Sequence, residues 1–119
     1  MPSFTTTEDC PEYYFEERCY IRELLNSEQT PGLSIAQARV LPGVTTVLHA
    51  VKGTEVYYIL SGEGVAEVGE ERSTVTAGML VHILPGEAQR IHNSGKENLV
   101  FLAICSPRFL PEDYRSLGA

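Results

Sequence analysis

Short apolar runs alternate with turn residues along most of this chain. From Tyr14 onward the runs are rich in Val, Ile, Thr and Tyr, the residues that β-strands prefer. Paired turn residues such as Pro42-Gly43, Pro85-Gly86 and Asn93-Ser94 separate them at short intervals, which leaves no window for a long helix. The expected strands are residues 19–25, 33–41, 44–51, 56–60, 65–68, 74–76, 79–84, 89–92 and 99–105. This pattern predicts an all-β sandwich or barrel.

The two ends of the chain depart from this pattern. Residues 1–13 are polar and hold two prolines, so we expect a flexible N-terminal segment ahead of a single domain over residues 14–119. Residues 107–117 are the place where a short C-terminal helix is expected, with Pro111 at its first turn ahead of two acidic residues.

Some of the expected strands are apolar on both faces. Neither parity is polar in residues 56–60 or in residues 99–104, whereas a strand with one face in water should alternate. Their outer face is therefore expected to be covered, either by the N-terminal strands or by a second subunit. In a chain of 119 residues we favour the second subunit and predict a homodimer.

Charge and cysteine content exclude several classes of partner. The formal net charge is −7, and residues 1–28 carry seven acidic residues against two basic ones, which indicates a solvated acidic face. A chain without a basic stripe is a poor binder of nucleic acid and of anionic membranes. There is no apolar run long enough for a membrane span and no signal-peptide pattern at Met1. Three cysteines without a CxxC motif then favour a cytoplasmic protein with free thiols.

Two blocks in the middle of the chain carry the candidate chemistry. The first reads G-x5-H-x-V-x3-E-x6-G from Gly43 to Gly62, with His49 on a strand and Glu55 at the start of the next one. A hairpin at Lys52-Gly53 would bring the two side chains together. The second block reads G-x7-G-x2-Q-x3-N from Gly78 to Asn93, and Gln89 opens a strand there.

These blocks resemble the paired motifs of the small single-domain cupins, over residues 33–106. The family's first motif is G-x5-H-x-H-x3,4-E-x6-G and its second is G-x5-P-x-G-x2-H-x3-N. The resemblance implies a double-stranded β-helix, which is a jelly-roll barrel. It also implies that residues at the motif histidines and glutamate face the lumen, where metal-binding cupins hold an ion.

This sequence departs from the motifs at two ligand positions. Val51 stands where the family has its second histidine, and Gln89 stands where it has its third. The implied metal ligands are therefore His49, Glu55 and Gln89, and a divalent Fe, Mn, Ni or Zn ion would be weakly bound because an amide is a poorer donor than imidazole.

Other residues of the barrel are candidates to contact a ligand. Tyr57 and His82 are expected at the ligand-binding site, and Cys105 on the last long strand has a smaller claim. One hypothesis is a metal-dependent enzyme on a small molecule, in the range of dioxygenases, isomerases and cyclases. The alternative is a metal-free module that binds a small or sugar-like molecule without catalysis. A purely structural dimer would not explain polar residues aimed into an apolar barrel.

Overall fold

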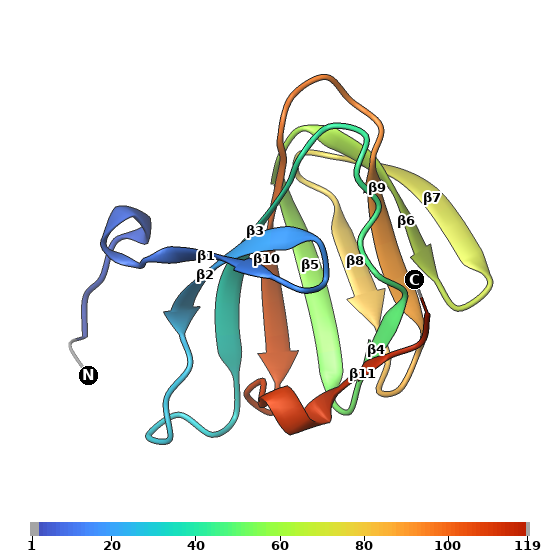
Figure 1. The fold of residues 1–119 in the computed structure, drawn as a ribbon. Helices are drawn as coiled ribbons and strands as arrows, with labels where there is room; N and C mark the ends of the chain where they lie inside the picture. Colours follow the sequence, from blue (N-terminus) through green and yellow to red (C-terminus); the bar gives the residue numbers. More distant parts are fainter. Residues whose placement is uncertain (1–2, 119) are drawn as a thin grey trace.

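Two antiparallel sheets make up nearly all of the molecule (Figure 1). The computed structural model describes residues 3–118. One sheet has six strands in the order β1-β2-β3-β10-β5-β8, and the other has five in the order β11-β4-β9-β6-β7. The all-β jelly-roll prediction is confirmed. Among the described residues, no helix is long and apolar enough to cross a membrane.

The strand bounds follow the turn residues closely. In the six-stranded sheet they are β1 (Glu12–Phe15), β2 (Cys19–Leu25), β3 (Ser34–Val40), β5 (Thr54–Ser61), β8 (Leu80–Ile83) and β10 (Leu99–Ser106). In the five-stranded sheet they are β4 (His49–Val51), β6 (Glu63–Val68), β7 (Glu71–Thr76), β9 (Gln89–Asn93) and β11 (Tyr114–Ser116). Gly62 shows why a glycine marks such a turn. Its φ is +87°, and a Cβ there would lie 2.6 Å from the carbonyl oxygen of Asn98.

Each terminal part of the chain contains a short strand that the sequence pattern does not predict. A 3-10 turn, η1 (Thr7–Asp9), precedes β1, which begins at Glu12; the boundary at residue 14 stays a prediction. The short C-terminal helix considered from the sequence is not shown beyond a 3-10 helix of three residues that begins at Pro111. This 3-10 turn, η2 (Pro111–Asp113), gives way to β11, because the chain pairs there with β4 instead of continuing a helix.

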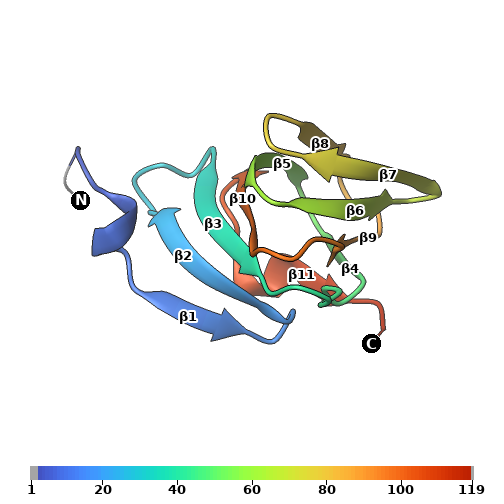
Figure 2. The ribbon, with the colours of Figure 1, turned by 90° about the horizontal axis from the view of Figure 1, so that it is seen from above.

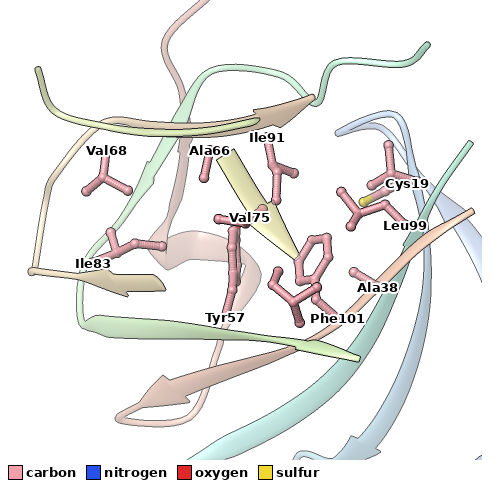
Figure 3. Packing of buried hydrophobic residues seen from close by; sticks show 12 residues of the cluster. Cys19, Ala38, Tyr57, Ala66, Val68, Val75, Ile83, Ile91, Leu99 and Phe101 are labelled. Atoms are coloured by element: carbon pink, nitrogen blue, oxygen red, sulfur yellow. The ribbon is translucent and has the colours of Figure 1, made fainter. Parts of the chain in front are cut away.

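Seen from above, the two sheets face each other around a common interior, and the β1–β2 hairpin lies at one side of the molecule (Figure 2). The core fills the space between the sheets. Tyr57, Leu99 and Phe101 from the six-stranded sheet meet Ile91 and other residues of the five-stranded sheet (Figure 3). Inward positions alternate along β5, which buries Glu55, Tyr57 and Ile59 and leaves Tyr58 and Leu60 exposed.

The outer face of β5 and β8 carries apolar side chains that remain exposed to solvent. Tyr58 is 40% exposed and Leu80, on the neighbouring β8, is 59% exposed. The N-terminal strands do not cover this face, because β1 and β2 extend the same sheet beyond β3. The other cover that the sequence allowed is a second subunit, and the homodimer stays a prediction.

Candidate functional site

Glu55 lies on the inner face of β5, where the strand's alternation turns it away from solvent. Only 6% of the residue is exposed. Across the barrel, Gln89 opens β9 directly after the turn at Pro85-Gly86 and is fully buried. The Gln89 amide Nε2 donates a hydrogen bond of 2.6 Å to Glu55 Oε1, joining the two sheets. The structure thus brings together two of the three residues that the motif spacing selects.

A thiol also faces the Glu55 carboxyl. Cys105 is the backbone partner of Glu55 on β10, and its Sγ lies 3.6 Å from Glu55 Oε2 as a weak donor. Burial raises the pKa of Glu55 from 4.5 to about 7, and the hydrogen bonds from Gln89 and Cys105 oppose that rise only in part. Neither neighbour carries a positive charge, so the carboxyl is held by neutral groups.

His49 lies on β4 and is 1% exposed. Its Nδ1 is 2.7 Å from the carbonyl oxygen of Val47. A carbonyl only accepts, so Nδ1 carries the hydrogen and Nε2 is left as an acceptor. Burial lowers the pKa of His49, which keeps the ring neutral, although the backbone hydrogen bond works in the opposite direction.

Glu17 occupies the other side of the His49 ring. Its Oε1 lies 3.5 Å from His49 Nε2, and its side chain is only 13% exposed. Burial, and then the charge of Glu55, raise the pKa of Glu17 well above its usual range. A protonated Glu17 facing the lone pair of Nε2 satisfies both groups without any charge. The sequence predicted that the acidic N-terminal residues form a solvated face. Glu17 is an exception to that prediction, because its side chain is buried.

The turn between β1 and β2 carries Glu17 into the site. Arg18 has a φ of +73°, and its Nε donates a hydrogen bond of 2.9 Å to the carbonyl oxygen of Thr45. The backbone N–H of Val47 donates a hydrogen bond of 3.0 Å to the backbone carbonyl oxygen of Glu17. These contacts fix the turn against the segment that leads into β4. Sequence reasoning missed Glu17, because nothing in the spacing of its neighbours distinguishes it from other acids.

An aromatic ring also covers the His49 side chain. Tyr114 of β11 stacks on the imidazole, with ring centroids 5.1 Å apart and an interplanar angle of 20°. Phe15 meets the Tyr114 ring edge-on at 5.4 Å. Tyr114 is a second residue that the motifs could not identify, because its position depends on a strand that the sequence did not predict.

A cavity of about 80 Å³ opens along the inner face of the six-stranded sheet. That is several times the roughly 10–15 Å³ needed for one water molecule. Its wall is mainly apolar, with Tyr57 and Phe101 in contact at a centroid distance of 4.5 Å. Glu55, Glu17 and Cys105 line it as well, whereas His49 and Gln89 lie behind these side chains.

The two residues expected at the ligand site have different positions. Tyr57 is 3% exposed and lines the cavity. His82 does not reach the lumen, which corrects the expectation. It is exposed on the outer face of β8, because the inward parity of that strand belongs to Val81 and Ile83. The hairpin expected between His49 and Glu55 is also wrong, since β4 and β5 belong to opposite sheets.

The donor atoms do not fit a divalent ion as they stand. Over the part of the chain that the structure describes, no three His, Cys, Asp or Glu side chains converge on one point. The Gln89 amide nitrogen, which cannot ligate a metal, contacts the Glu55 carboxyl, and His49 faces Glu17. Gln89 Oε1 is buried without a hydrogen-bond partner, but one neutral oxygen does not complete a metal site.

Comparison with known proteins agrees with the fold and its motifs. A family model described as the cupin domain matches residues 37–105, more than half of the chain. An uncharacterised protein of Methanocaldococcus jannaschii is 34% identical over 104 residues, which covers 85% of this chain and 83% of that protein. An oxalate-binding protein of Thermotoga maritima is 37% identical over 70 residues, 58% of each chain.

Solved structures share the same architecture. A predicted oxalate decarboxylase from Thermotoga maritima is 26% identical with a TM-score of 0.80, over 87% of this chain and 98% of that one. The polyketide cyclase RemF from Streptomyces resistomycificus has a TM-score of 0.83 at 17% identity, over 100% of this chain and 87% of that one, so that likeness shows the fold alone.

Proposed function

Because this chain belongs to the cupin domain family, we propose that the lumen of its barrel binds a small organic molecule directly through protein side chains, without a resident metal ion. The observation that carries the proposal is the position of Glu55, a nearly fully buried carboxyl on the wall of an apolar cavity. Burying a carboxyl is costly, and an apolar residue would serve the core better. We attribute the carboxyl at this position to the binding of a ligand.

The surroundings of Glu55 support direct binding. Gln89 holds the carboxyl from behind, Cys105 contacts it from the cavity wall, and the Tyr57 and Phe101 rings form the adjoining wall. Ligand pockets typically combine such apolar walls with a few positioned polar groups.

The metal-dependent reading of the motifs is the competing function. It would make His49, Glu55 and Gln89 the ligands of an Fe, Mn, Ni or Zn ion that acts on a small substrate. The pairing of Gln89 with Glu55 and of His49 with Glu17 favours the metal-free alternative, because each donor is already engaged with a protein group. The names of the relatives point to oxalate as a probe for either reading.

A binding screen on untagged protein separates the two functions. The probes are a set of small organic fragments and oxalate, followed by ligand-observed NMR with and without EDTA. We expect fragments to bind equally in both conditions. Binding that disappears with EDTA and returns with added Zn²⁺ or Mn²⁺ would establish the metal-dependent function instead, and a protein that binds no probe in either condition would refute the proposal.

A cavity-filling variant locates the binding. Ala103 lines the cavity on β10, so Ala103→Leu should reduce fragment affinity by filling the space. Ala77→Leu makes the same chemical change at an exposed turn and is the matched control. Equal affinities in the two variants would show that fragments bind elsewhere.

A further inference from the structure

The cavity lining contains acidic side chains and no basic ones among the described residues. Its lining includes the carboxyl groups of Glu17, Glu23 and Glu55, and none of the described lining residues is Lys, Arg or His. Glu55 and Glu17 belong to the buried end, whereas Glu23 is exposed and accepts a hydrogen bond of 3.1 Å from the Tyr13 hydroxyl. An anionic ligand would meet carboxyl groups along the cavity and no positive group to offset them.

The other lining groups are mainly apolar and aromatic. Phe15, Tyr57, Phe101 and Phe109 contribute rings, and Ala36, Ala38 and Ala103 keep the middle of the cavity open. Aromatic faces attract cations, and the attraction grows when the cation is removed from water. A wall of rings with carboxyl groups at its buried end therefore suits an organic cation better than a neutral or acidic molecule.

The buried carboxyl lacks the partner that buried charges normally have. Glu55 is 6% exposed, and its contacts are an amide and a thiol. Buried charges in proteins are usually paired or coordinate a metal. A cation would approach Glu55 from the cavity side, because Glu55 lines the cavity whereas Gln89 is not among the lining residues.

We infer that the ligand of this barrel is an amine, with an ammonium group directed to Glu55 and Glu17 and a short apolar body against the aromatic wall. This inference rests on the proposed function and narrows it to one chemical class. The cavity of about 80 Å³ limits the body to a few carbon atoms. The net charge of −7 adds a long-range attraction for cations, which raises the rate of encounter.

The test uses three molecules that share a four-carbon frame, namely n-butylamine, 1-butanol and butyrate. Affinities are measured by calorimetry near neutral pH in phosphate buffer, since amine buffers would compete. We expect n-butylamine to bind about tenfold or more tightly than 1-butanol, in line with a charge-assisted hydrogen bond. Butyrate should bind the least tightly of the three.

Variants test whether Glu55 and Glu17 cause the preference for n-butylamine over 1-butanol. Glu55→Gln keeps the shape of the side chain and removes its charge, so the preference for the amine over the alcohol should fall about tenfold. Glu17→Gln should lower it as well. Glu70→Gln, at an exposed turn, is the control and should leave the preference unchanged.

The outcomes separate this inference from the proposed function. Equal affinity for amine and alcohol, or tighter binding of butyrate, would overturn the amine class while fragment binding in EDTA still supports a metal-free binding barrel. An amine preference that survives in Glu55→Gln and Glu17→Gln together would also overturn it, because the cation would then be held elsewhere. If neither the fragments nor the three probes bind, the proposed function itself is wrong.

Discussion

Replacing Glu55 by Gln should change how the stability of the protein depends on pH. The folded protein holds a proton on Glu55 up to about pH 7, whereas the unfolded chain releases it near 4.5. The native state therefore binds more protons between these values, so the contribution of Glu55 to stability is greatest below 4.5. It decreases as the pH rises through 7.

The size of the effect follows from the two pKa values. The difference between 4.5 and about 7 corresponds to about 3 kcal/mol of unfolding free energy over the full range. Because the sequence pI is about 4.9, where solubility is poor, the measurement should begin near pH 5.5. From about pH 5.5 to about pH 8.5, some 2 kcal/mol of the effect is accessible.

Urea unfolding followed by circular dichroism provides the assay. The Glu55→Gln variant retains an acceptor for the Gln89 amide and cannot ionise. Its stability relative to the wild type should therefore rise by about 2 kcal/mol across this pH range. The opposite pH trend from His49, whose pKa burial lowers, is common to both proteins and largely cancels in the difference.

Glu17 adds to the same trend. The charge of Glu55 contributes to the raised pKa of Glu17, so removing that charge relieves Glu17 as well. Glu70→Gln is the control, since the Glu70 side chain is in water in both states. Unfolding free energies of wild type and Glu55→Gln that stay parallel within about 0.5 kcal/mol would refute the reasoning, because the carboxyl would then be ordinary in the folded protein.

Three further predictions concern the fold, the assembly and the binding of metal ions. Asn93→Ala removes three buried or part-buried hydrogen bonds of 2.8 to 2.9 Å to the backbone and should cost about 3 kcal/mol in urea unfolding; a loss below about 1 kcal/mol would contradict this. Light scattering should give twice the chain mass of 13.1 kDa, and Leu80→Asp on the exposed apolar face should give the single mass; a wild-type monomer at micromolar concentration would exclude the dimer. Zn²⁺ titration by calorimetry should give negligible heat for the wild type and clear binding for the double variant Val51→His/Gln89→His, which has histidines at both motif positions. Strong heat from the wild type would contradict the argument that contacts with protein groups keep His49, Glu55 and Gln89 from binding a metal ion.

The sequence predicted the strands best where turn residues separate them. The expected run 19–25 coincides with β2, and β9 begins at Gln89 as expected. The strands that it missed, β1 and β11, have four and three residues. Segments this short have little pattern of their own, and they are strands because β2 and β4 provide their backbone partners.

In the site, too, residues set by local sequence could be predicted, and a residue set by contacts distant in sequence could not. Glu55 and Gln89 could be predicted because the motif spacing and strand parity place both side chains inside, and their contact of 2.6 Å agrees with that. The role of Glu17 could not be predicted. Its burial depends on a turn held by Thr45 and Val47, which lie far from the turn in sequence.

The departures from the cupin motifs and the unexpected Glu17 have one electrostatic consequence. Val51 removes one imidazole from the lumen and Gln89 replaces another with a neutral amide, while the carboxyl of Glu55 is kept. Glu17 then adds a second carboxyl beside it, so the site has fewer groups to hold a metal ion and more negative groups to neutralise. Protons neutralise the two carboxyls when nothing else does, which is why burial raises both pKa values. An ammonium group can replace those protons without any metal ligand, so the residues that set the pH dependence of folding are also those that would select the ligand.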